Sequence, residues 1–239
     1  MPNRILTRAD LNERNEYAAS DSLHVDGSLA IPAELGTVYF RGSVTVQNNI
    51  TIGASINAKY DIDAGWGIEV GRDITAGQSI TAGRDITAGK GIEAGRRITA
   101  RKSITAGWDI RAGGGITAGD GITAGWGITA GLGIAAGWGI TAVDGIEAGG
   151  GITAEGSIAT SGRIVTAGRI TAGRDIIAGW RITARKSITA GWHISAGGGI
   201  TAGNDVSAKF DIYATDKVIR CRRLVSGTVA YGTLIEEGR

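Results

Sequence analysis

Aliphatic residues recur at every sixth position along most of this chain. From Val38 to Leu224 each hexad carries Ile, Val or Leu at the same place, with no insertion or deletion. Two positions later stands a small residue, usually Ala, and Gly usually follows it. The residue between the aliphatic and the small position is most often Thr, which makes the consensus I-x-A-G-x-x.

This spacing predicts short β-strands joined by corners. Side chains two positions apart on a strand point to the same side, so the aliphatic residue and Ala face inward and the residue between them faces outward. A single three-residue strand cannot bury its aliphatic side chain, but stacked coils bury one strand against the next. A period of six does not fit the 3.6-residue repeat of a helix face.

The hexads resemble those of the hexapeptide-repeat parallel β-helix proteins, although Ala takes the inward site before Gly that is usually aliphatic in that family. The resemblance implies an all-β parallel β-helix, or β-solenoid, in which three hexads form a triangular, left-handed coil of 18 residues. At this size residues 38–224 make about ten to eleven coils, stacked at about 4.8 Å each.

The segments at residues 25–29 and 40–44 are also similar to bactofilins, which are polymer-forming bacterial β-solenoids. That resemblance implies a scaffold rather than an acyltransferase. Bactofilin coils are less regular and wind right-handed, so the strict hexads favour the left-handed form.

We expect three regions: an N-terminal cap at 1–37, the solenoid at 38–224, and a C-terminal cap or docking strand at 225–239. Residues 8–16 are expected to form a short helix. The ends of a solenoid expose unpaired strand edges, which promote polymerisation unless they are covered. The candidates for end-to-end assembly are Val229, Tyr231, Leu234 and Ile235.

All six tryptophans stand two residues before an inward aliphatic residue, which places them at corners: Trp66, Trp108, Trp126, Trp138, Trp180 and Trp192. Trp108 and Trp126 are expected on adjacent coils, and Trp192 beside Phe210. Exposed aromatic columns can bind a protein or a glycan. Alternatively, each ring lies flat over the glycines of the next corner, which is the interpretation we favour.

Regular Thr columns, such as Thr81, Thr99 and Thr117, are similar to those of ice-binding β-solenoids, but the neighbouring outward column is mixed. In addition, residues 97–120 and 181–204 are near-copies whose separation is not a whole number of coils. Duplication of this kind preserves the core and scrambles any ordered surface.

The sequence contains few residues in patterns typical of catalytic or metal-binding sites. The two histidines, His24 and His193, cannot supply the three ligands of a zinc site within one chain, and no loop interrupts the hexads as in hexapeptide acyltransferases. Cys221 is the only cysteine, so no intrachain disulfide forms. We therefore expect no catalytic residues, no cofactor and no metal.

Charge and hydropathy indicate which partners and which cellular location to expect. The formal net charge is +2, which predicts neither nucleic-acid nor membrane-surface binding. The first thirty residues lack the apolar run of a signal peptide, which favours a cytoplasmic location.

The sequence predicts a non-enzymatic β-solenoid that acts as a structural scaffold or self-assembling homo-oligomer. The alternative is a non-polymerising module that binds a protein or glycan through the Trp corners. Ice binding and acyl transfer are less favoured.

Overall fold

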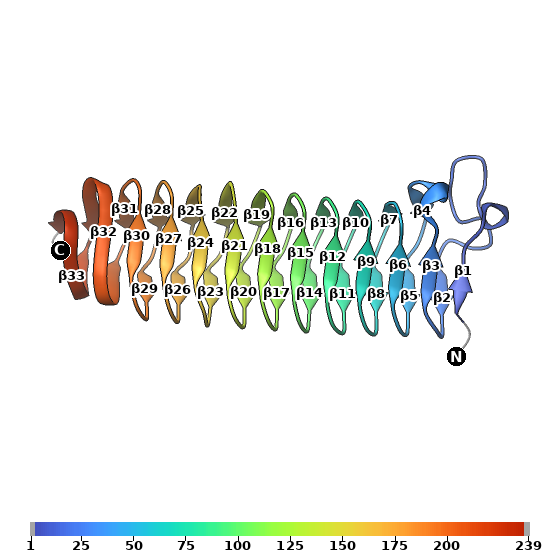
Figure 1. Ribbon diagram of the computed structural model, residues 1–239, viewed down its shortest axis with the longest axis horizontal. Helices are drawn as coiled ribbons and strands as arrows, with labels where there is room; N and C mark the ends of the chain where they lie inside the picture. Colours follow the sequence, from blue (N-terminus) through green and yellow to red (C-terminus); the bar gives the residue numbers. More distant parts are fainter. Residues whose placement is uncertain (1–2, 237–239) are drawn as a thin grey trace. The chain divides into compact units, whose positions relative to one another are not determined.

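The computed structural model describes residues 3–236, except for the side chains of residues 216 and 217. It is an all-β parallel β-solenoid, divided into two units, Met1–Gly119 and Asp120–Arg239 (Figure 1). The strands of the first unit are β1 (Arg4–Ile5), β2 (Leu23–Val25), β3 (Leu29–Ile31), β4 (Val38–Phe40), β5 (Val44–Val46), β6 (Ile50–Ile52), β7 (Ile56–Ala58), β8 (Ile62–Ala64), β9 (Ile68–Val70), β10 (Ile74–Ala76), β11 (Ile80–Ala82), β12 (Ile86–Ala88), β13 (Ile92–Ala94), β14 (Ile98–Ala100), β15 (Ile104–Ala106), β16 (Ile110–Ala112) and β17 (Ile116–Ala118).

The strands of the second unit are β18 (Ile122–Ala124), β19 (Gly127–Ala130), β20 (Ile134–Ala136), β21 (Ile140–Ala142), β22 (Gly145–Ala148), β23 (Ile152–Ala154), β24 (Ile158–Thr160), β25 (Arg163–Thr166), β26 (Ile170–Ala172), β27 (Ile176–Ala178), β28 (Ile182–Ala184), β29 (Ile188–Ala190), β30 (Ile194–Ala196), β31 (Ile200–Ala202), β32 (Asp205–Cys221) and β33 (Arg223–Glu236).

Through most of the solenoid three strands form each coil, and a strand pairs with the third strand before it and the third after it. In β10, Ile74 is aligned with Ile56 of β7 on one side and with Ile92 of β13 on the other. These offsets of 18 residues confirm that three hexads make one coil. The left-handed sense stays a prediction.

The core consists of stacked aliphatic and Ala side chains. In β11, Ile80 is fully buried and Ala82 is 2% exposed, whereas Thr81 between them faces solvent. The same alternation runs through the short strands, as the hexad pattern predicts.

The corner glycines are required by close stacking rather than by a left-handed backbone. A Cβ added to Gly83 would lie 1.8 Å from the carbonyl oxygen of Gly65, one coil earlier. Among the described glycines, a positive φ occurs only at Gly36, Gly227 and Gly232. The hexad glycines therefore let the backbones of successive corners approach each other.

Side chains just before the inward aliphatic residue stabilise the stack of corners. The Asp61 carboxylate accepts a hydrogen bond from the Ser79 N–H at 2.9 Å, and the Asp85 carboxylate accepts one from the Ser103 N–H at 3.1 Å. Asn49, Ser55, Asp73 and Asp175 act in the same way toward the coil that follows. The acidic residues at these corners are thus structural acceptors and not only partners for basic neighbours.

The hexad frame slips by one residue in β32. The sequence pattern places Val218 inward, but Ile219 pairs with Ile200 and is fully buried, while Val218 is 37% exposed. Keeping the frame would direct the Arg220 side chain inward, and burying that charge is costly. The slip instead buries Ile219 and Cys221, so this part of the prediction was wrong.

The ladder also begins before residue 38, because β2 pairs with β5 and β3 pairs with β6. A short 3-10 turn at Ala33–Leu35 separates β3 from β4, which hides these strands from a strict period of six. The expected helix over residues 8–16 is absent. A single 3-10 turn, Arg8–Asp10, stands there, and the Asn12 carboxamide oxygen accepts hydrogen bonds from the N–H groups of Arg14 and Glu16. Such side-chain bonds compete with helical backbone bonds.

Candidate functional site

The first coil of the first unit is closed over its core. Leu23, Val25, Leu29 and Ile31 are all at most 6% exposed, even though they start the ladder. Strand β1 lies along β3, and the segment that follows it carries three further buried side chains, Leu6, Leu11 and Tyr17. The Tyr17 ring contacts the Phe40 ring, with 5.7 Å between the centroids.

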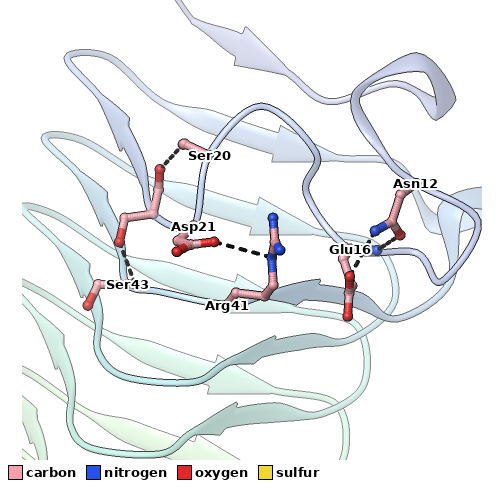
Figure 2. Close-up of polar contacts among 7 residues, drawn as sticks. Asn12, Glu16, Ser20, Asp21, Arg41 and Ser43 are labelled. Atoms are coloured by element: carbon pink, nitrogen blue, oxygen red, sulfur yellow. Dashed lines mark hydrogen bonds and ion pairs between the residues drawn. The ribbon is translucent and has the colours of Figure 1, made fainter.

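Polar contacts fasten this covering segment to the first strands (Figure 2). Asp21 forms an ion pair with Arg41 at 3.2 Å, and the Ser22 hydroxyl accepts a hydrogen bond from the Ser43 N–H at 3.0 Å. The Tyr17 N–H donates to the Tyr39 carbonyl oxygen at 2.9 Å. Residues 3–22 therefore cover this end, whereas β2 and β3, which the sequence analysis assigned to the cap, belong to the ladder.

The last coil of the second unit is built differently. β33 runs parallel to β32 and places Leu224, Val229 and Leu234 over Val206, Ile212 and Ile219. These three β33 side chains are only half-buried, whereas the three beneath them are fully buried. No described strand lies on the other side of β33, which is the last strand in Figure 1, so no described strand covers the side chains of Leu224, Val229 and Leu234 from that side.

The sequence contains a signal for this coil that the hexad analysis missed. The segment from Leu224 reads L-V-S-G-T, V-A-Y-G-T, L-I-E, a repeat of five instead of six. Gly227 and Gly232 occupy its corners with φ of 103° and 124°, a left-handed conformation that favours glycine. The change of period marks the place where the regular stack ends.

The backbone of β33 also presents a directional edge. Within the solenoid, the inward residue directs its N–H and C=O toward the following coil: the Ile62 N–H donates to the Ser79 carbonyl, and the Ala64 carbonyl accepts from the Gly83 N–H. By the same parity, we expect Leu224, Val229 and Leu234 to direct these groups toward the open side of β33. The Leu224 N–H is met there by the Glu236 carboxylate at 2.7 Å.

The four predicted assembly residues thus fall into two classes. Val229 and Leu234 lie at inward positions of the exposed coil, whereas Tyr231 and Ile235 point outward and are 51% and 38% exposed. Beside the start of β33 lies a hollow of about 380 Å³ lined by Asn204, Asp205, Arg222 and Arg223. Arg223 is paired with Asp205 at 3.6 Å, and Arg222 forms no ion pair with any described residue.

The tryptophans lie at corners, as predicted, and the rings of Trp66, Trp108 and Trp192 each contact a cation one coil away. Arg84 lies over the Trp66 ring at 4.9 Å, Lys90 over Trp108 at 4.8 Å, and Arg174 over Trp192 at 5.4 Å. These cation–π pairs favour a structural role for the rings.

Trp138 and Trp180 are the most exposed tryptophans, at 65% and 74%. Phe210 lies one coil after Trp192, because its N–H donates to the Trp192 carbonyl at 3.0 Å. Trp108 and Trp126 belong to different units, and their stacking stays a prediction.

The outward Thr column is present in the first unit, where Thr99 is aligned with Thr81 and Thr117. Asp63 precedes Thr81 in this column. Burial raises the pKa of the Asp63 carboxyl, and the nearby Asp61 carboxylate adds to the effect. A carboxylate within the column interrupts the repetition of hydroxyl groups.

The histidines are engaged in local pairs. The His193 ring lies 3.0 Å from Asp175 and contacts the Phe210 ring, and His24 lies 3.0 Å from Asp26. Among the described side chains, no three of His, Cys, Asp or Glu gather as a metal site. Burial raises the pKa of the Cys221 thiol. A shallow groove of about 360 Å³ in the first unit is lined by Ser55, Asp73, Asp109 and neighbouring residues.

Among the described residues no helix is long and apolar enough to cross a membrane. Comparison of the chain with protein-family models, with curated proteins and with solved structures returns no match.

Proposed function

We propose that this protein is a non-enzymatic structural scaffold that associates with itself through the last coil of its solenoid. The observation that carries the proposal is the contrast between the two terminal coils. The first coil is covered by residues 3–22, while β33 leaves Leu224, Val229 and Leu234 half-buried beside a strand edge without a described neighbour.

An exposed edge of this kind is a template for another strand. Unpaired N–H and C=O groups and an adjacent apolar surface favour addition of a strand from another chain. The regular stack of Ile and Ala side chains supplies the rigidity that a scaffold needs, because interiors packed this closely do not deform easily.

The test is a pair of charge substitutions on the same strand. Leu234→Lys places an ammonium group in the apolar interior of the last coil and is expected to abolish association in sedimentation velocity. Tyr231→Lys introduces the same charge on an outward side chain and is expected to leave association intact. Equal effects of the two substitutions, or none, would contradict the proposal.

A second candidate function is favoured by the exposure of Trp138 and Trp180, neither of which forms a cation–π pair with a described residue. Large exposed aromatic surfaces occur at protein- and glycan-binding sites. Under this alternative, a Trp138→Ala, Trp180→Ala double variant loses binding to its partner while self-association is unchanged. A screen of soluble polysaccharides by tryptophan fluorescence provides the first readout.

A further inference from the structure

The last coil has a symmetric arrangement of apolar residues. Leu224, Val229 and Leu234 are spaced five and five, so Val229 stands midway between two leucines. A two-fold axis through Val229 and perpendicular to the stack would place each leucine opposite the other leucine of a second copy. The same axis would place Val229 opposite itself.

We infer that two copies of this chain join through β33 in a closed, two-fold symmetric pair centred on Val229. This inference rests on the proposed function and specifies its partner and geometry. A perpendicular two-fold axis reverses the chain direction, so the two β33 strands run antiparallel. Interfaces of this type contact the same patch on both copies and close on themselves.

The backbone groups are directed correctly for this arrangement. In an antiparallel ladder, residues that face each other as a hydrogen-bonded pair exchange both N–H···O=C bonds. Leu224, Val229 and Leu234 direct these groups to the open side, so each side of the coil gains one such pair. The Leu224 N–H, now held by Glu236, donates instead to the Leu234 carbonyl of the second copy.

Charge complementarity supports the same register. Glu236 and Leu224 lie at one corner, since the Glu236 carboxylate accepts the Leu224 N–H. Arg222 and Arg223 line the hollow at the start of β33. The axis that pairs Leu224 with Leu234 also brings the Glu236 carboxylate, once released, toward Arg222 of the second copy. Arg222 has no ion-pair partner among the described residues of its own chain.

The covered first coil explains why the association stops at two. Head-to-tail stacking would require free edges and an exposed core at the first coil, whereas residues 3–22 bond along the edges of β3 and β4 and the core side chains there are buried. A pair formed through β33 uses the coil whose outer side no described strand covers. Closed pairs are therefore expected, in contrast to the filaments that the resemblance to bactofilins implies.

Disulfide cross-linking tests the register directly. In a Cys221→Ser background, Val229→Cys is expected to form a covalent dimer under mild oxidation with copper–phenanthroline. Facing residues of a hydrogen-bonded antiparallel pair lie about 5.5 Å apart at Cα, within the range that a disulfide spans. Leu224→Cys and Leu234→Cys are each expected to remain uncross-linked alone and to cross-link when the two variants are mixed.

The outcomes separate this inference from the proposed function. If the Cys221→Ser chain associates but Val229→Cys does not cross-link, or Leu224→Cys cross-links alone, the two-fold register is wrong and self-association stands. If the chain is monomeric at all concentrations tested, the proposed function fails as well.

Discussion

The one-residue slip in β32 provides a sharp test of the core, because the sequence pattern and the structure assign opposite orientations to neighbouring residues. Ile219 is fully buried against Ile200, whereas Val218 is 37% exposed. Ile219→Ala removes three buried carbons, each worth about 0.8 kcal/mol, and leaves a cavity. We therefore expect the free energy of unfolding to fall by about 2–5 kcal/mol. Val218→Ala removes two partly exposed carbons and should cost about 1 kcal/mol or less.

Hydrogen exchange is the suitable assay, because each coil of a solenoid contacts only its neighbours and damage to one coil stays local. A loss of 2 kcal/mol or more raises exchange of the β32 amides by about 30-fold or more, given tenfold per 1.4 kcal/mol. Val218→Ala is the matched control and should raise it by less than about tenfold. A larger effect from Val218→Ala than from Ile219→Ala would refute the slip and restore the unbroken hexad frame.

Three further predictions concern corners and columns. Gly83→Ala forces a Cβ against a backbone carbonyl oxygen and should lower the stability measured by thermal unfolding by about 1–3 kcal/mol. Gly91→Ala, whose added Cβ has its nearest contact at 3.5 Å, should be close to neutral, and equal losses of stability would contradict the close-stacking explanation. Asp85→Ala leaves the Ser103 N–H without its acceptor and should cost about 1 kcal/mol, while Asp85→Asn keeps the acceptor and most of the stability; identical losses would argue against a structural hydrogen bond. The pKa of the Asp63 carboxyl is higher in the folded than in the unfolded chain, so ionisation of this group destabilises the fold once the pH exceeds the unfolded-state pKa. Asp63→Asn should therefore be more stable than the parent at pH 7 and equally stable near pH 3, as measured by urea titrations. A stability gap that widens toward low pH would reverse the sign of that argument.

The repeat was predictable because one physical requirement recurs in every hexad. A strand of three residues must bury two side chains, so the pattern of inward Ile and Ala with an outward Thr indicates both the strand and which of its faces is buried. Three-hexad coils followed from a family resemblance and are confirmed by the 18-residue registers, for example Ile74 with Ile56.

The irregular ends were less predictable, for identifiable reasons. Ala33–Leu35 adds residues between β3 and β4, so β2 and β3 fall outside the period although Leu23 and Leu29 are core residues. At the other end, Val218 and Ile219 are both β-branched, and the cost of burying Arg220 favours the frame that turns Ile219 inward.

The candidate site was located only in part. Val229 and Leu234 are recognisable from the sequence as apolar residues of the C-terminal segment, but the sequence does not separate them from the outward Tyr231 and Ile235 where the period changes. Leu224 was counted with the hexads, although it begins the pentad coil. Recognising the L-x-x-G-T spacing would have identified it.

Light scattering of the purified chain across a concentration series tests most directly whether β33 is an assembly surface. We expect the mass to rise from 24.5 kDa toward twice that value and to stop there, because the two-fold pair uses the β33 surface of both copies. A mass of 24.5 kDa at every concentration would contradict self-association, and growth well beyond two copies would contradict the closed pair.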